Sequence, residues 1–181
     1  METESLNLRD RAKRAYEVGR VLRAAAWSIP TLLLGAGVAL LVHEVSVPLL
    51  LAAALYAVSV FLLWWGRAPG KGVLPGITYG LLPLAAGVVA KLHGHVCMGF
   101  ACYTSCMLFC VGGGVIAGLL TARLAARSKS PLAVFLSGAS MALFTGAIGG
   151  GCVGLHGIVG MGLGIAVGIV PMMLFRRPRH E

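Results

Sequence analysis

The sequence predicts an all-α integral membrane protein with six transmembrane helices arranged as three hairpins. Of the 181 residues, 58% are hydrophobic and only 12% are charged, whereas an average soluble domain carries about 25% charged residues. Apolar runs of about 18 residues or more recur along the chain, and each is long enough to cross a hydrocarbon core of roughly 30 Å as a helix. The basic residues are concentrated in alternate loops.

The apolar runs place the six spans at approximately 25–43, 47–65, 73–91, 99–121, 131–150 and 155–175. Together they form a membrane domain over residues 25–175, preceded by a cytoplasmic basic segment at 1–24 and followed by a basic tail at 176–181. The linkers GRAPGKG (66–72) and ARSKSP (126–131) are turn-like in composition.

The distribution of charge predicts the orientation. All 15 Lys and Arg residues except Lys91 fall in the N-terminal segment, the second and fourth loops or the tail. Basic residues collect in cytoplasmic loops, so both termini are expected in the cytoplasm, with the chain in the inner membrane. Trp27, Trp64 and Trp65 fall at the cytoplasmic ends of spans, where interfacial aromatic residues are common. This topology accounts for the net charge of +9 without direct nucleic-acid binding.

Two absences in the sequence disfavour other classes. No Asp, Glu, Lys or Arg falls in the middle of a predicted span, which is atypical of ion-coupled transporters because these bind their ions through ionisable groups within the membrane. No segment outside the predicted spans is large enough to fold as a catalytic domain, so enzyme activity is not expected.

Small residues recur at every fourth position in the last three spans. Such rows let helix backbones approach closely in lipid, within one chain or between copies in a homo-oligomer. We interpret the three cysteines of the fourth span as small packing residues of such a row, and the alternative is a soft-metal or redox role. The rows comprise Cys102, Cys106, Cys110, Gly114, Gly118 and Ala122 in the fourth span, Gly138, Ala142, Gly146 and Gly150 in the fifth, and Gly160, Gly164 and Gly168 in the sixth.

The predicted outer loops hold a second set of cysteines and histidines, namely His93, His95, Cys97, Cys152 and His156. A disulfide between Cys97 and Cys152 is one interpretation, because the space outside the inner membrane is oxidising. Ligation of a zinc or copper ion is another, since imidazole and thiolate suit both metals. Ordinary hydrogen bonding by the histidines is the third.

Two of these loops resemble each other. LHGHVCMG (92–99) and LHGIVGMG (155–162) share the pattern L-H-G-x-V-x-M-G at a separation of 63 residues. A tandem duplication of helical hairpins would produce this pattern, and His93 and His156 would then occupy equivalent positions.

The N-terminal segment has the pattern of a short basic amphipathic helix. Asn7 and Asp10 match a helix-capping pattern. The helix either lies on anionic lipid or docks a cytoplasmic partner. In the second case the contacting residues are expected to be Leu8, Arg9, Ala12, Lys13, Tyr16 and Arg20.

Residues 130–175, SPLAVFLSGASMALFTGAIGGGCVGLHGIVGMGLGIAVGIVPMMLF, resemble the C-terminal hairpin of the NrsF-type membrane anti-sigma factors. The resemblance implies six spans and a cytoplasmic N-terminal segment that holds an extracytoplasmic-function (ECF) sigma factor at the membrane. The spacing of Cys152 and His156 and the short N-terminal segment differ from that family's pattern.

The leading hypothesis is therefore an inner-membrane regulatory protein. Its N-terminal segment would sequester a sigma factor, and its outer Cys/His loops would sense a redox or metal signal. Two alternatives from other classes are a small soft-metal carrier, which would pass the ion along the fourth span, and a structural or assembly subunit of the membrane.

Overall fold

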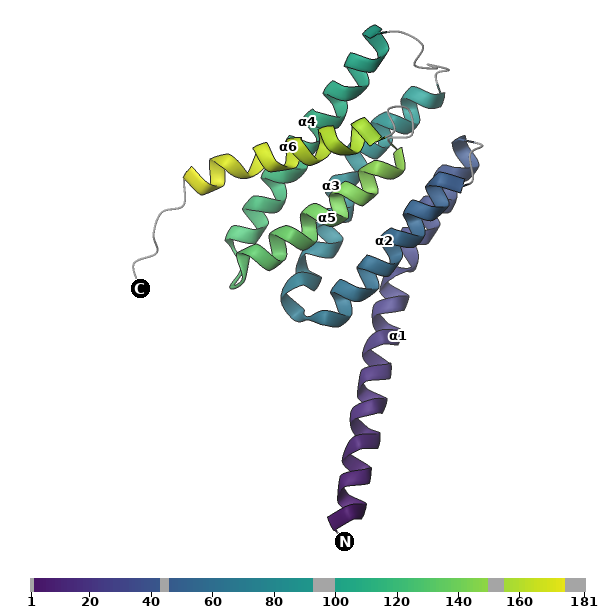
Figure 1. Ribbon diagram of the computed structural model, residues 1–181, viewed down its shortest axis with the longest axis vertical. Coiled ribbons are helices and arrows are strands. Elements are labelled where there is room, and N and C mark those ends of the chain that lie inside the picture. Colours follow the sequence, from purple (N-terminus) through teal and green to yellow (C-terminus); the bar gives the residue numbers. More distant parts are fainter. Residues whose placement is uncertain (1, 43–45, 93–99, 150–154, 175–181) are drawn as a thin grey trace.

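The computed structural model describes residues 2–42, 46–92, 100–149 and 155–174, and all regular structure in them is helical. Its six helices are α1 (Glu2–Val42), α2 (Ser46–Trp65), α3 (Arg67–Leu92), α4 (Phe100–Ala126), α5 (Pro131–Gly149) and α6 (Leu155–Leu174). Figure 1 shows α2 to α6 gathered in one bundle, with the N-terminal half of α1 extending beyond it. The prediction of an all-helical chain is thus confirmed.

Five of these helices, α1 to α5, are long and apolar enough to cross a membrane. In α6 the apolar stretch is shorter and covers Gly157–Pro171. Many large apolar side chains lie on the outside of the bundle, among them Leu33, Leu50 and Leu108. This surface suits a multi-pass membrane protein, because lipid chains solvate apolar side chains that water would not.

Two helix boundaries differ from the expected ones. The structure has no break near residue 24, and α1 runs as one helix of 41 residues through the N-terminal segment and the first span. The stretch GRAPGKG was expected to be a turn, but only Gly66 lies outside the helices and α3 begins at Arg67. Pro69 fits the first turn of α3 because the N–H groups there have no partner within the helix.

The closest helix pairs are not neighbours in sequence. Helix α3 packs most extensively on α5, and α4 packs on α6. Gly72, Gly76 and Gly80 follow one face of α3 and lie against Val134, Gly138 and Ala142 of α5, in that order. The two helices therefore run parallel, and the missing side chains let their backbones touch.

Helix α6 crosses α4 (Figure 1), and glycines again allow the two backbones to approach each other closely. A Cβ atom added at Gly118 of α4 would lie 2.6 Å from the Ile165 carbonyl oxygen, and one added at Gly168 of α6 would lie 2.7 Å from that of Val115. Near the middle of the bundle, Pro83 of α3 is close to both Gly113 of α4 and Gly146 of α5. Backbone approach at glycine thus determines how four of the helices are arranged.

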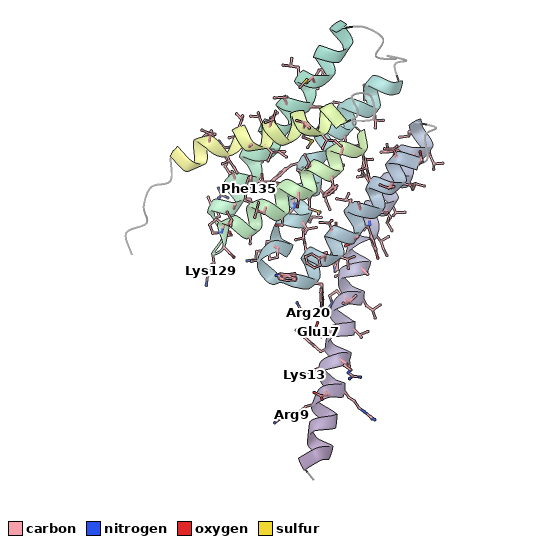
Figure 2. The ribbon with its side chains drawn as sticks, viewed as in Figure 1. Arg9, Lys13, Glu17, Arg20, Lys129 and Phe135 are labelled. Atoms are coloured by element: carbon pink, nitrogen blue, oxygen red, sulfur yellow. The ribbon has the colours of Figure 1, made fainter. Side chains whose placement is uncertain are left out.

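Helix α1 runs antiparallel to α2, with Gly35 of α1 against Pro48 and Ala52 near one end of the pair. Near the other end, Trp64 of α2 bonds to Glu17 and Arg20 of α1. The residues before Glu17 extend past the end of α2 (Figure 2). We call residues 2–16 of α1 the projecting segment.

Candidate functional site

The projecting segment presents basic and apolar side chains on an exposed helix. Arg9, Ala12 and Lys13 are exposed, and the Tyr16 side chain is 65% exposed. Arg9 and Lys13 are four residues apart and therefore lie near one another on the helix surface, as Figure 2 shows. Leu8 belongs to the same helix, although its side chain lies outside the described ones.

The base of the projecting segment is bonded to the end of α2. The Arg20 Nη2 group donates a hydrogen bond to the Trp64 carbonyl oxygen at 2.6 Å. The Trp64 indole Nε1 donates to Glu17 Oε2 at 3.0 Å, and Arg20 Nη1 lies 3.6 Å from Glu17 Oε1. We call these three contacts the Arg20–Trp64 clamp.

The clamp forms where local structure leaves a carbonyl group unpaired. The last carbonyl groups of a helix lack intrahelical partners and carry its partial negative charge. Trp64 lies in the last turn of α2, which ends at Trp65. The Arg20 guanidinium satisfies one of these carbonyl groups and places a positive charge at the negative end of the helix, so the contact stabilises α2 as well as the position of α1.

A cavity of about 640 Å³ lies beside the clamp. Arg20 and Arg23 supply two positive charges to its lining, and the lining contains no acidic residue. We call it the basal cavity, and its lining consists of Ala15, Tyr16, Gly19, Arg20, Arg23, Ala24, Trp27, Leu63, Gly66 and Gly70. Its composition favours an anionic ligand with an apolar part.

The residues predicted to sense a metal or redox signal are largely beyond the described part of the chain. His93, His95, Cys97 and Cys152 lie outside the described residues. His156 belongs to the first turn of α6, but its side chain is outside the described set. Among the described residues, no group of three His, Cys, Asp or Glu side chains is placed to hold a metal ion. The metal and disulfide interpretations therefore stay predictions.

The structure brings the small residues of α4 and α6 together. Gly114 lies against Met161, and Gly164 lies against Val111 and Val115. Gly160 faces Val111, and a Cβ atom added at Gly160 would lie 3.3 Å from the Val111 Cγ2 atom. In α5, Gly146 contacts Met161.

The cysteines of the same row are described less fully. Cys110 has a free thiol and is half-buried. Cys102 and Cys106 lie in α4, but their side chains are not among those described. Gly150 lies outside the described residues.

Several residues of this site carry no strong signal in the sequence. Glu17, Arg23, Gly66 and Gly70 fall in segments expected to be a surface helix and a turn. Glu17 and Arg20 have the spacing of a helical ion pair, but their contact with Trp64 joins residues 44 and 47 positions apart. Only the packing of α1 on α2 reveals it.

Comparison with known proteins gives no relative that would assign an activity to this site. No known protein family, no curated protein and no solved structure matches the chain.

Proposed function

We propose that this chain is a membrane-embedded regulatory protein whose projecting segment binds a cytoplasmic protein. The observation that carries the proposal is the length of α1, which has 41 residues in one helix. At about 1.5 Å per residue such a helix is roughly twice as long as the hydrocarbon core is thick. Half of α1 is therefore available outside the membrane.

The orientation of the bundle follows from its charges. The projecting segment, the start of α3 (Arg67 and Lys71) and the α4–α5 connection all carry Lys or Arg, and the positive-inside rule assigns this end to the cytoplasm. With α6 as the sixth span of three hairpins, both termini lie on that side of the inner membrane. With the five native cysteines replaced by alanine, an impermeant thiol reagent should label a Lys129→Cys variant in inverted vesicles but not in intact cells. Labelling in intact cells would reverse the orientation.

A protein partner suits the projecting segment better than a lipid surface. A helix that lies on lipid runs in the plane of the interface, whereas the projecting segment continues the axis of the first span away from the bundle (Figure 1). Among its exposed residues, Arg9 and Tyr16 belong to the types that are enriched at the centres of protein interfaces, and Lys13 adds positive charge beside them. An acidic groove on the partner would match this surface.

The partner we propose is an ECF sigma factor. This choice rests on the resemblance of residues 130–175 to NrsF-type anti-sigma factors. Binding at the membrane would keep the sigma factor from RNA polymerase until a signal releases it.

Charge reversal on the projecting segment provides the test. The full chain carrying Arg9→Glu and Lys13→Glu is purified from membranes, and the co-purified proteins are identified by mass spectrometry. We expect loss of a sigma factor that the unaltered chain retains. The matched control, Arg127→Glu with Lys129→Glu, makes the same change of charge in the α4–α5 connection and should retain it. A chain that yields no sigma factor, with the projecting segment intact, would overturn the proposal.

The signal in this proposal is a redox change or a metal ion at the outer loops. Cys97 and Cys152 would form a disulfide, or would bind zinc or copper together with His93, His95 and His156. We expect that zinc, copper or an oxidant changes sigma-factor retention by the unaltered chain. The variant with Cys97→Ser and Cys152→Ser should not respond. An unchanged response in this variant would exclude both cysteines as the sensor.

The packing registers bear on the proposed duplication. Contacting residues of α3 and α5 are 62 positions apart in the pairs Gly76–Gly138 and Gly80–Ala142, close to the 63-residue separation of the two loop patterns. Gly118 of α4 instead meets Ile165 of α6, which a simple duplication does not give. The register of α3 and α5 agrees with the proposed repeat, whereas that of α4 and α6 does not. The repeat stays a prediction, and the proposed function does not depend on it.

A further inference from the structure

We propose that the basal cavity binds the phosphate headgroup of an anionic phospholipid from the cytoplasmic leaflet. This site shares Tyr16 with the exposed face that is proposed to bind a protein, but its two arginines, Arg20 and Arg23, lie outside the projecting segment, and it does not require that partner.

The charges of the cavity favour an anion. The Arg20 guanidinium is held by the clamp and faces both Glu17 and the Trp64 carbonyl oxygen. Arg23 also lines the cavity and, within the described part of the chain, makes no hydrogen bond or ion pair. Its guanidinium can therefore give its donors to a phosphate, with which it forms strong bidentate hydrogen bonds.

Two helix ends meet at the cavity and their partial charges offset each other. Gly66 lies between the end of α2 at Trp65 and the start of α3 at Arg67, and both Gly66 and Gly70 line the cavity. The negative end of α2 therefore opposes the positive end of α3, and the Gly70 N–H already donates to the Gly66 carbonyl oxygen at 3.2 Å. The positive charge of the cavity thus comes mainly from Arg23, because Arg20 also lies 3.6 Å from Glu17.

The position of the cavity identifies a lipid as the source of the phosphate. Trp27 lines the cavity and its side chain is 72% exposed, and Trp65, at the end of α2, is 69% exposed. Tryptophan side chains gather at the level of the lipid headgroups. Beyond Trp27, α1 continues into the membrane with Ile29 and Leu33 exposed. A headgroup in the cavity would therefore lie beside an apolar surface that can accommodate its acyl chains.

The volume fits the same ligand. Sites for small molecules commonly occupy about 300–1,000 Å³, and this cavity has about 640 Å³. That space accommodates a phosphate with its glycerol group. A zwitterionic headgroup would bring a choline cation close to Arg20 and Arg23, and this repulsion favours an anionic lipid.

The test is a titration of the purified full chain in a non-ionic detergent. Intrinsic tryptophan fluorescence is followed while dioctanoyl phosphatidylglycerol, dioctanoyl phosphatidylcholine or inorganic phosphate is added below the lipid's critical micelle concentration. We expect saturable binding of phosphatidylglycerol, with phosphatidylcholine and inorganic phosphate binding at least about fivefold more weakly.

Two variants assign the binding to the cavity. Arg23→Gln should weaken phosphatidylglycerol binding by about fivefold or more, whereas Arg127→Gln removes the same charge from the α4–α5 connection and should leave it unchanged. Gly19→Leu keeps both arginines and places a large side chain in the cavity, since Gly19 is part of its lining. The new side chain fits without a clash, because a Cβ atom at Gly19 meets no other atom within 4 Å. It should also weaken binding, and a thermal midpoint close to that of the unaltered chain verifies folding.

Three results would overturn the proposal. Equal affinities for the two lipids would remove the selectivity for anions. Equal effects of Arg23→Gln and Arg127→Gln would show that phosphatidylglycerol binds through the general surface charge and not in the cavity. Inorganic phosphate binding as tightly as phosphatidylglycerol would make the cavity a site for a soluble anion. Since none of these measurements uses a protein partner, the sigma-factor proposal stands or falls separately.

Discussion

Arg20 of α1 donates a hydrogen bond to the carbonyl oxygen of Trp64, and this contact holds the projecting segment to the end of α2. The Trp64 ring returns a hydrogen bond to Glu17, one turn before Arg20. Any movement of α2 at this end is therefore passed to the base of the exposed helix. In the proposed function, this contact adds a second connection between the membrane domain and the bound protein, beside the continuous helix α1.

Loss of the clamp should loosen the projecting segment without unfolding the bundle. A hydrogen bond to a charged group contributes about 1.5–3 kcal/mol, and the contribution here is at the low end because the Arg20 side chain is 37% exposed. With the five native cysteines replaced by alanine, spin labels at Lys13→Cys and Lys129→Cys measure the distance between the segment and the α4–α5 connection. We expect Arg20→Ala to broaden the distance distribution, whereas Arg14→Ala should not. An unchanged width would show that the clamp does not position α1.

Gly19 should set the stiffness of the helix just before the clamp. Glycine in a helix interior is less favourable than alanine by about 1 kcal/mol, and a Cβ atom at Gly19 contacts no neighbour. Gly19→Ala should therefore slow amide hydrogen exchange in the projecting segment, while Gly19→Pro should accelerate it by interrupting the helix. Exchange in α5 is the internal reference. Faster exchange in Gly19→Ala would contradict a continuous α1.

The positions of the helices were predictable because the thickness of the membrane sets the length of an apolar run. The second span was expected at 47–65 and is found at Ser46–Trp65. The continuity of α1 was not predictable, because a change from polar to apolar composition resembles a boundary although the helix crosses it. The clamp was not predictable either, since it joins residues brought together only by packing.

Gly114 and Gly112 lie two residues apart in α4 and should respond oppositely to alanine. A Cβ atom at Gly114 would meet backbone atoms of Met161, at 3.1 Å from its Cα, whereas one at Gly112 meets nothing within 4 Å. Overpacking a tight contact costs about 1–3 kcal/mol, and alanine at an open helix position is favourable. Thermal midpoints in detergent should fall for Gly114→Ala and stay level or rise for Gly112→Ala. Equal midpoints would mean that α4 and α6 do not touch at Gly114.

The pairing of α3 with α5 illustrates what hydropathy leaves undetermined. In lipid no apolar helix face is preferred over another by burial alone, so small residues decide which helices approach. The relevant signal, Gly72, Gly76 and Gly80, has the same four-residue spacing as the rows of the last three spans. A row in α3 and a row in α5 indicate close contacts for each helix, but not that they contact each other.

Replacing Thr145 by valine should stabilise the folded protein. Its hydroxyl group is fully buried and, within the described part of the chain, has no hydrogen-bond partner. Leaving a buried polar group unpaired costs about 1–3 kcal/mol, and valine has nearly the same shape without the hydroxyl. The Thr145→Val variant should therefore have a higher thermal midpoint in detergent than the unaltered chain.

Thr121 is the matched control, because it is equally buried but bonded. Its hydroxyl donates to the Ala117 carbonyl oxygen at 2.6 Å, so Thr121→Val removes a hydrogen bond rather than an unpaired group. We expect this change to lower stability by about 0.5–1.5 kcal/mol. If both variants shift the midpoint in the same direction, the Thr145 hydroxyl is paired in the folded protein. The opposite shifts expected here would instead show that the Thr145 hydroxyl is unpaired, and that Thr145 contributes to the folded protein through its packing against Gly80 of α3.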